Sequence, residues 1–470
     1  MTHYDLAIVG TGSGNSVLDE RYDDMSVAIC EQGIFGGTCL NVGCIPTKMF
    51  VYTAEVAESA NDSARFGVDA RVTGVRWPDI VSRIFGRIDP LSLGGQNYRR
   101  SSPNVTVYDR HTRFGPGVNG RHTLRVDGGE QFTADKVVIA AGSRALVPKE
   151  ITNSGVPYYT SDTIMRIAKL PRHLVIIGGG YVATEFAHIF SSLGSHVSLM
   201  IRGSTLLRGH DDTVMTRFTD IAAKKWEIHG HHNVVGARGH DGEVEVICDN
   251  GSSVRGDALS IATGRAPNGD LLDAHLAGVD VDHTGRVLVD EYQRTSARGI
   301  FALGDVSSEY QLKHVANHEA RVVRHNELQD WDDTEAMVAS DHRYVPSAVF
   351  TDPQIASVGL TENQARARGY HFKVKVQDYS DVAYGWAMED TTGFAKVIVD
   401  DDARLILGAH LMGYQASSLI QPIVQAMSFG LDAQDLARGQ YWIHPALPEV
   451  IENALLALCG EPPWPPSRQH

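Results

Sequence analysis

Cysteine is scarce in this sequence, with five residues among 470. Small secreted domains that depend on a disulfide scaffold have a much higher cysteine density, so this class of protein is excluded. Only Cys39 and Cys44 lie close together along the chain, with four residues between them. In a reducing compartment, such a pair indicates either a catalytic dithiol or a metal site.

Long apolar runs and excess positive charge are also missing. No uninterrupted apolar stretch reaches the roughly 18 residues needed to span a bilayer. The formal net charge of −15 disfavours general attraction to nucleic acid or anionic lipid. The first strand-like run, Tyr4 to Val9, begins too close to Met1 to leave room for a cleavable leader. We therefore expect a cytoplasmic protein with small-molecule partners and no membrane or nucleic-acid partner.

The chain is long enough for about three domains of ordinary size. Its first pattern is a strand, Tyr4 to Val9, followed by the glycine-rich turn Gly10 to Gly14, an expected helix, and the strand Ser26 to Cys30. In a dinucleotide-binding fold, Gly10 allows the tight turn and Gly12 lets the backbone approach the pyrophosphate. The third small residue is expected at position 15, where this chain has Asn15, so we expect looser packing of helix on strand there.

The same pattern returns in the middle of the chain. A strand, Leu174 to Ile177, leads into Gly178, Gly179 and Gly180, and a helix with Ala183 and a strand, His196 to Ile201, come next. Here Gly178, Gly180 and Ala183 satisfy the full spacing. The sequence thus predicts an α/β protein with two tandem Rossmann-like dinucleotide-binding domains.

Three further segments complete the predicted organisation. The runs Val137 to Gly142 and Leu259 to Gly264 are each expected to close one nucleotide-binding domain. The run Gly299 to Val306 predicts a buried strand that ends at an acidic residue, and we expect a helix after it. From about Pro346, antiparallel strands and helices, among them a helix from Ser418 to Phe429, predict a separate α+β domain. The proline-rich tail 461–470 is expected to be flexible.

The end of the second strand in each pattern selects the dinucleotide. Glu31 is placed to accept hydrogen bonds from both ribose hydroxyls in the first domain. In the second domain this position is Ile201, followed by Arg202 and Arg208. Two arginines favour a 2′-phosphate, which indicates NADPH rather than NADH. The alternative is that both arginines are solvated surface residues.

The segment Gly36 to Lys48 carries the strongest chemical signal. Cys39 and Cys44 are five positions apart, which corresponds to about 7.5 Å of rise in a regular helix, beyond the usual Cα separation of a disulfide. A bridge therefore requires a distorted turn, and Gly43 and Pro46 favour one. A zinc site is the competing interpretation, but Cys30, Cys248 and Cys459 lack ligand spacing, so no metal is expected.

His444 precedes Glu449 by five residues near the end of the chain. Alone, such a histidine is more often a packed core residue than a catalyst. Beside a dithiol it gains a role, because thiol–disulfide exchange needs a group that stabilises the attacking thiolate and protonates the leaving one. Glu449 would hold His444 in the useful tautomer.

Taken together, four features resemble the class I flavoprotein disulfide reductases: the redox segment 36–48, the two glycine-rich turns, the segment 301–306 and the segment 444–449. Their order and spacing match this family over essentially the whole chain. The resemblance implies a homodimer with shared active sites, in which electrons pass from NADPH through FAD to the Cys39–Cys44 bridge.

The resemblance also implies individual roles. Cys39 would attack the substrate, Cys44 would lie against the flavin, Lys48 would pair with Glu185, and His444 would act across the subunit interface with Glu449. Tyr181 would cover the nicotinamide pocket, and Asp305 would bind the ribityl and phosphate region of FAD. The residues predicted to bind the two cofactors are Gly10, Gly12, Gly14, Glu31, Thr38, Asp305, Gly178, Gly180, Tyr181, Glu185, Arg202, Arg208 and Gly264.

The corresponding domain limits are 1–150 for FAD, 151–266 for NADPH, 267–343 for a central domain that completes the FAD site, and 344–470 for dimerisation. One branch of the family reduces mycothione, the disulfide of mycothiol, and so maintains the cell's thiol pool. The chain resembles this branch in the residue patterns of segments 10–16, 313–321, 382–390 and 439–449. A glutathione-reducing enzyme is the nearer alternative. A dihydrolipoamide dehydrogenase is less favoured because position 201 is not acidic, and a non-enzymatic flavin-binding protein would need no dithiol.

Overall fold

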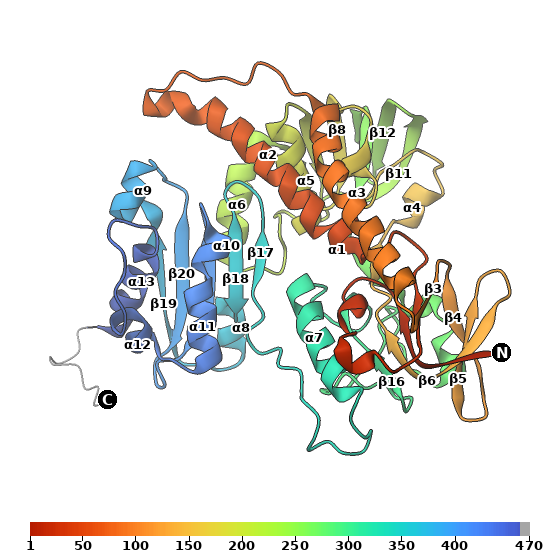
Figure 1. Cartoon of the computed structure of the whole chain (residues 1–470). Helices are drawn as coiled ribbons and strands as arrows, with labels where there is room; N and C mark the ends of the chain where they lie inside the picture. Colours follow the sequence, from red (N-terminus) through yellow and green to blue (C-terminus); the bar gives the residue numbers. More distant parts are fainter. Residues whose placement is uncertain (461–470) are drawn as a thin grey trace. The chain divides into compact units, whose positions relative to one another are not determined.

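The computed structural model describes residues 1–460, and the tail 461–470, predicted to be flexible, lies outside them (Figure 1). The chain divides into two compact units. The first unit contains Met1–Thr53, Val72–Pro171 and Ala258–His342, and the second contains Ala54–Arg71, Arg172–Asp257 and Arg343–His470. None of the helices in the described part of the chain is long and apolar enough to cross a lipid bilayer.

The main sheet of the first unit has the strand order β3-β2-β1-β6-β5-β4, and β16 also pairs with β6. The central strand β1 runs parallel to both β2 and β6, so that Val9 lies between Cys30 and Ile139. Side chains alternate between the two faces: Leu6 and Ile8 enter one buried apolar cluster, and Ala7 and Val9 enter another. The strands are β1 (Thr2–Val9), β2 (Val27–Cys30), β3 (Val105–Tyr108), β4 (Thr112–Val118), β5 (Arg121–Val126), β6 (Gln131–Ile139) and β16 (Ile300–Ala302).

Helices cover this sheet, and smaller strands complete the unit. Ala320 and Val323 of α7 join the same cluster as Leu6 and Ile8, so α7 covers that face. The helices are α1 (Gly37–Asn41), α2 (Cys44–Asp62), which continues into the second unit, α3 (Trp77–Ser101), α4 (Lys149–Thr152) and α7 (Lys313–Asn326); the smaller strands are β7 (Ser143–Ala145), β14 (Ala258–Ile261) and β15 (Arg265–Pro267).

The helix expected after the first glycine-rich turn does not form, and this prediction is wrong. Two short 3₁₀ turns, Gly14–Ser16 and Glu20–Tyr22, take its place. The guanidinium of Arg99 donates to Oδ1 of Asn15 at 2.8 Å and to the carbonyl oxygen of Asn15 at 3.0 Å. Asp19 accepts from the backbone N–H of Arg21. Such side-chain partners compete with the regular hydrogen bonds of an α-helix.

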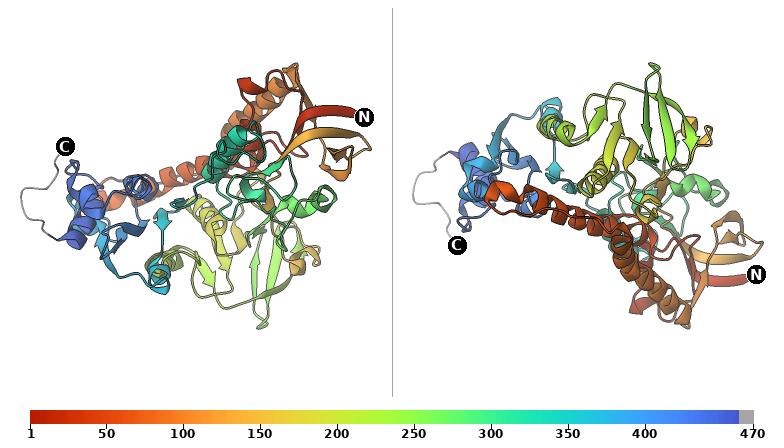
Figure 2. Two further views of the ribbon diagram at one scale, coloured as in Figure 1. Left: turned by 90° about the horizontal axis from the view of Figure 1, so that it is seen from below. Right: turned by 90° about the horizontal axis from the view of Figure 1, so that it is seen from above.

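The second unit contains a parallel sheet in which β9 lies between β10 and β8. An antiparallel three-stranded sheet follows it in the chain and is drawn in green in Figure 2. This alternation of strands and helices confirms the second predicted dinucleotide-binding pattern. Its elements are β8 (His173–Ile177), α5 (Tyr181–Ser192), β9 (His196–Met200), α6 (Asp212–Lys225), β10 (Glu227–His229), β11 (Val234–His240), β12 (Glu243–Cys248) and β13 (Ser253–Gly256).

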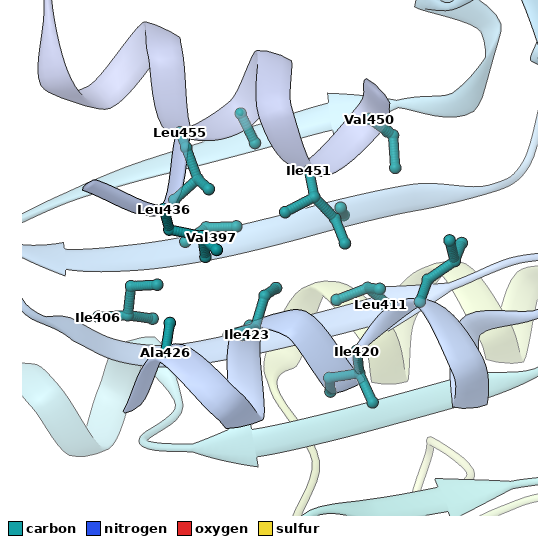
Figure 3. Close-up of a cluster of buried hydrophobic side chains, with 14 of the residues drawn as sticks. Val397, Ile406, Leu411, Ile420, Ile423, Ala426, Leu436, Val450, Ile451 and Leu455 are labelled. Carbon is teal, nitrogen blue, oxygen red and sulfur yellow. The ribbon is translucent and has the colours of Figure 1, made fainter. Parts of the chain in front are cut away.

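The later part of the second unit is the predicted α+β domain. Its antiparallel sheet has the order β17-β18-β21-β20-β19, built from β17 (Ser347–Val349), β18 (Ile355–Gly359), β19 (Phe372–Asp378), β20 (Phe394–Asp400) and β21 (Ile406–Met412). The helices are α8 (Glu362–Ala367), α9 (Ala383–Ala387), α10 (Ala416–Leu419), α11 (Gln421–Phe429), α12 (Ala433–Arg438) and α13 (Glu449–Cys459). Figure 3 shows side chains of α11 and α13 against the strand residues Val397 and Leu411 in one buried cluster.

One helix of this domain differs from the sequence prediction. A single helix was expected from Ser418 to Phe429, but the chain forms α10 and α11 with a break at Ile420. Pro422 lies in the first turn of α11. Proline has no N–H to continue a preceding helix and is favoured in the first turn of a new one, which explains the division.

Candidate active site

The two redox cysteines lie in successive helices. Cys39 belongs to the short helix α1, and Cys44 is the first residue of the 19-residue helix α2. The distorted turn that their spacing predicted is present, because the helix stops at Asn41 and restarts at Cys44. A Cβ atom on Gly43 would lie 3.0 Å from the carbonyl oxygen of Thr38, so the turn has little room for a side chain. Both cysteines are free thiols in this structure.

The pKa values of the two thiols are shifted in opposite directions from that of a free cysteine. The hydrogen bond from the Cys39 thiol lowers the pKa of Cys44 to about 7, against desolvation, with help from the positive charges of Lys48 and Lys313. The start of a long helix also favours a thiolate at this position. The hydrogen bond to Cys44 raises the pKa of Cys39, and burial raises it further. Cys44 is therefore the first of the pair to ionise, and Cys39 needs a base.

Lys313 is a charged residue near the two cysteines that the sequence reasoning missed. It begins α7, and its Nζ donates to Oγ of Ser13 at 2.8 Å in the first glycine-rich turn. A lysine is unfavourable at the positive end of a helix dipole. Segment 313–321 had been noted for its family resemblance, and the unfavourable position of a lysine at its start could have identified Lys313. Lys313 supplies a second cation to the redox pair besides Lys48.

The first glycine-rich turn is closely packed. Gly10 has φ +108°, and a Cβ atom there would lie 2.2 Å from the carbonyl oxygen of Ala140. A Cβ on Gly14 would lie 2.6 Å from Cβ of Ala140 and 3.1 Å from Cγ2 of Ile8. The expectation of looser packing at Asn15 is therefore wrong, because Gly14, one position earlier, provides the close approach to the sheet.

Two more of the predicted cofactor residues flank this turn. Glu31 follows β2, and its carboxylate accepts from the backbone N–H of Thr11 at 3.0 Å and of Gly33 at 2.9 Å. Gly12 lies against the start of α1, since a Cβ on Gly37 would be 2.6 Å from Cα of Gly12. Thr38 is in the first turn of that helix. The structure thus brings Gly12, Glu31 and Thr38 to the carboxyl edge of the sheet.

Asp305 reaches the same edge from β16, which pairs in parallel with β6. It lies in the 3₁₀ turn Gly304–Val306, and Oγ of Ser143 donates to its carboxylate at 2.7 Å. The buried carboxylate of Glu319, which the sequence reasoning did not identify, accepts from the backbone N–H of Gly304 at 2.6 Å. Gly264 has φ +128°, and its carbonyl oxygen accepts from the backbone N–H of Leu146.

The second glycine-rich turn connects β8 to α5. Gly178 has φ +136°, and Gly180 is the N-cap of this 12-residue helix. The free N–H groups at the start of such a helix attract phosphate. Tyr181 is the first residue of α5 and is exposed, whereas Ala183 is fully buried.

Arg202 and Arg208 are both exposed beyond the carboxyl end of β9, on the loop that follows it. The backbone N–H of Leu207 donates to the carbonyl oxygen of Gly179 at 2.7 Å, which fastens this loop to the glycine-rich turn. Ile201 is buried. The structure therefore brings two cations, and no carboxylate from position 201, to the predicted ribose end of the turn.

Glu185 and His444 lie in the second unit. Glu185 is buried in α5, and its Oε1 accepts from the backbone N–H of Phe350 at 2.9 Å. His444 lies before α13, and its Nδ1 is 2.7 Å from Oε1 of Glu449. Its side chain is 71% exposed. The pairing of Glu185 with Lys48 stays a prediction.

Glu449 is suited to orient His444. Burial opposes ionisation of Glu449, but the hydrogen bonds from His444 and from the backbone N–H of Ala446 lower its pKa overall. In the tautomer with a proton on Nδ1, His444 donates this N–H to the carboxylate of Glu449, and Nε2 is the nitrogen that can accept a proton. The arrangement supplies an exposed proton acceptor held in one tautomer.

Comparison with known proteins defines the class. The family model for pyridine nucleotide-disulphide oxidoreductases matches residues 4–320, and the model for the dimerisation domain of the same family matches residues 345–455. The chain belongs to the pyridine nucleotide-disulphide oxidoreductase family, which confirms the family predicted from the motifs.

The relatives narrow this class. Mycothione reductases of two Mycobacterium tuberculosis strains, CDC 1551 / Oshkosh and H37Rv, are 65% identical over 459 residues, covering 97% of this chain and 100% of each relative. A glutathione reductase of Burkholderia cepacia is 31% identical and covers 95% of this chain and 97% of its own. The solved structure of the HOCl-induced flavoprotein disulfide reductase RclA from Escherichia coli superposes with a TM-score of 0.84 at 29% identity, covering 97% of this chain and 100% of that chain.

Proposed function

We propose that this protein is a cytoplasmic, homodimeric, NADPH-dependent FAD enzyme that reduces mycothione to two molecules of mycothiol. The observation that carries this proposal is the 65% identity to the two mycothione reductases over 97% of the chain. The chemistry of Cys39 and Cys44 is consistent with it, because an acidic thiol beside a protonated one is suited to disulfide exchange.

The residues around the first glycine-rich turn fit FAD. Gly12 leaves the backbone open to a pyrophosphate, and Gly10 and Gly14 let the turn pack closely on the sheet. Glu31 is placed for ribose hydroxyls, and Thr38 and Asp305 lie at the same carboxyl edge. When bound, FAD would accept two electrons from NADPH and deliver them to the Cys39–Cys44 bridge. We assign residues 1–150 and 267–343 to holding it.

The residues around the second glycine-rich turn fit NADPH. Gly178 and Gly180 at the start of α5 would hold the pyrophosphate, and Arg202 and Arg208 would bind the 2′-phosphate. Tyr181 would cover the nicotinamide pocket, and Gly264 would contribute from the end of the adjoining segment. We assign residues 151–266 to this coenzyme and residues 344–470 to dimerisation.

The cysteines carry out the exchange in two balanced steps. The Cys39 thiolate attacks one sulfur of mycothione, which forms a Cys39–mycothiol mixed disulfide and releases the first mycothiol thiolate. The Cys44 thiolate then attacks the Cys39 sulfur, which re-forms the Cys39–Cys44 bridge and releases the second mycothiol. Two electrons are consumed and two thiols leave in each cycle.

His444 moves the proton in this scheme. Because the pKa of Cys39 is raised beside Cys44, the attacking thiol needs a base. Nε2 of His444, whose ring is held by Glu449, would take the Cys39 proton and return it to the first leaving thiolate. We propose that this histidine comes from the partner subunit, and that Lys48, paired with Glu185, polarises the flavin region.

A glutathione reductase is the second candidate, because the Burkholderia cepacia enzyme is 31% identical over 95% of the chain. The deciding measurement is the rate of NADPH oxidation by the purified protein with mycothione, glutathione disulfide or lipoamide offered separately, with NADH as the coenzyme control. We expect kcat/KM to be highest with mycothione. Preference for glutathione disulfide would support the second candidate, and no turnover of any disulfide would contradict both.

A further inference from the structure

A group of histidine and carboxylate side chains gathers at the amino ends of the parallel strands in the second unit. His173 begins β8, His196 begins β9 and Glu227 begins β10. The strand register pairs His173 with His196 and Glu227 with Ser198. Because side chains alternate along a strand, these residues all point to one face of the sheet.

The donor atoms of His173, His196 and Glu227 lie within 4.8 Å of one another. Nε2 of His196 is 3.2 Å from Oε2 of Glu227, and the two imidazole rings have centroids 4.4 Å apart. In a tetrahedral zinc site with bonds of about 2.0 to 2.1 Å, two ligand atoms lie about 3.3 Å apart. One of the three spacings, 3.2 Å, is already close to this value, and the other two do not exceed 4.8 Å. Within residues 1–460, no other three such side chains meet this criterion.

The backbone beneath the group is held firmly. The carboxylate of Asp257 accepts from the backbone N–H groups of Arg172 at 3.0 Å and His173 at 2.9 Å. The backbone N–H of Asp257 returns a hydrogen bond to the carbonyl oxygen of His173 at 3.0 Å, and that of His196 donates to Arg172 at 2.8 Å. The first residues of β8 and β9 are therefore fixed before any ligand arrives, which reduces the entropic cost of assembling a site.

We propose that His173, His196 and Glu227 form a binding site for a divalent transition-metal ion of the Zn²⁺ type. Two imidazoles and one carboxylate are a ligand set that zinc accepts, with water in the fourth position. Without metal, Oγ of Ser198 bridges the group, since it lies 2.8 Å from Nε2 of His173 and donates to Oε2 of Glu227 at 2.8 Å. The metal replaces this bridge. His229 lies behind Glu227, with its Nε2 3.3 Å from the second carboxylate oxygen, and helps to orient it.

The site is separate from the coenzyme turn. His173 stands at the amino end of β8, whereas Gly178 follows its carboxyl end. Five residue steps of about 3.3 Å place the two about 17 Å apart along the strand. A bound ion therefore ties three strands of the nucleotide-binding sheet together without occupying the glycine-rich turn. The inference does not depend on which disulfide the enzyme reduces.

The test is a calorimetric titration of the oxidised, FAD-bound, untagged protein with Zn²⁺ after treatment with a chelator. Oxidation keeps Cys39 and Cys44 from competing for the metal. We expect one Zn²⁺ per chain, an increase in Tm on binding, and at least a tenfold loss of affinity in His196→Ala. Glu227→Gln should show the same loss of affinity. This second variant takes the place of His196→Ala in the test if His196→Ala proves unstable.

The matched control is His240→Ala. His240 is also an exposed histidine near a carboxylate, 3.7 Å from Glu243, but among residues 1–460 no third His, Cys, Asp or Glu joins them in such a group. Its removal should leave both the affinity and the stoichiometry unchanged. The proposal is overturned if the wild-type protein binds no Zn²⁺ at micromolar concentrations, or if His196→Ala and Glu227→Gln bind it as tightly as His240→Ala does.

Discussion

At the scale of single residues, the two redox sulfurs differ in how readily they lose a proton. Cys44 begins a long helix, accepts a hydrogen bond from Cys39 and is near two lysines, and its pKa falls to about 7. The hydrogen bond to Cys44, burial and the charge of Cys44 raise the pKa of Cys39, although the two lysines oppose this rise. The negative charge therefore rests on Cys44, and Cys39, the proposed attacking sulfur, is activated only when a base is close.

Substitution of Lys313 by methionine should raise the pKa of Cys44, because it removes one of the two positive charges that stabilise the thiolate. If the pKa of Cys44 rises by about one pH unit, the fraction of Cys44 present as thiolate at pH 7 falls about fivefold. The rate of alkylation of Cys44 by iodoacetamide in the reduced enzyme, followed across pH and localised by fragment-ion mass spectrometry, measures this effect. Lys313→Arg retains the charge and is the control. An unaltered pH profile in Lys313→Met would show that Lys313 does not act on Cys44.

Glu449→Gln should slow thiol–disulfide exchange by about tenfold or more, because the neutral amide no longer stabilises the imidazolium that forms during proton transfer. Reduction of the enzyme by NADPH should be unaffected, since His444 has no part in that step. Stopped-flow measurement of the two half-reactions separates them. Glu452→Gln, one turn further along α13, is the control. Equal slowing of both half-reactions would point to a general structural defect and not to a role of Glu449 with His444.

At the scale of elements, the sequence predicted the two strand-and-turn patterns that the fold repeats. The glycine-rich turns, the strands around them and the break between α1 and α2 follow from local spacing, because tight turns and hydrophobic alternation depend on neighbouring residues. The missing first helix did not follow, because its competing partner, Arg99, comes from α3. The sequence analysis did not identify Lys313 or the group around His173 for the same reason. Their partners are distant in sequence and come together only in the folded chain.

The role of Gly14 as the close-packed residue of the first turn can be tested by stability. Gly14→Ala should destabilise the protein by about 1 to 3 kcal/mol, because its Cβ would press on Ala140 and Ile8. Gly86→Ala in α3 is the matched control: no atom approaches its Cβ within 4 Å, so the change should stabilise the protein by about 0.5 to 1 kcal/mol. Urea denaturation of the FAD-bound proteins measures both. Similar stabilities of the two variants would show that Gly14 is not tightly confined.

At the scale of the whole molecule, the residues of the proposed reaction belong to different parts of the chain. Cys39 and Cys44 lie in the first compact unit, and His444 and Glu449 lie in the second. The proposed base is therefore distant from Cys39 in sequence. The match of residues 345–455 to a dimerisation domain supports the proposal that the histidine reaches the thiol from the partner subunit. Sequence order alone gives no means of choosing between a histidine from the same chain and one from its partner.

A hybrid dimer distinguishes these two arrangements. One chain carries Cys39→Ser and the other carries His444→Ala, and differently tagged chains allow the hybrid to be purified. If each site combines Cys39 of one chain with His444 of the other, one of the two sites loses both residues and the second site keeps both. The hybrid should then show about half the disulfide-reducing activity of the wild-type dimer, whereas each homodimer is nearly inactive. If the histidine acts within its own chain, both sites of the hybrid are defective, and it should be no more active than the parent variants. Equal flavin content in all three dimers would ensure that the difference reports on the shared site and not on cofactor loss.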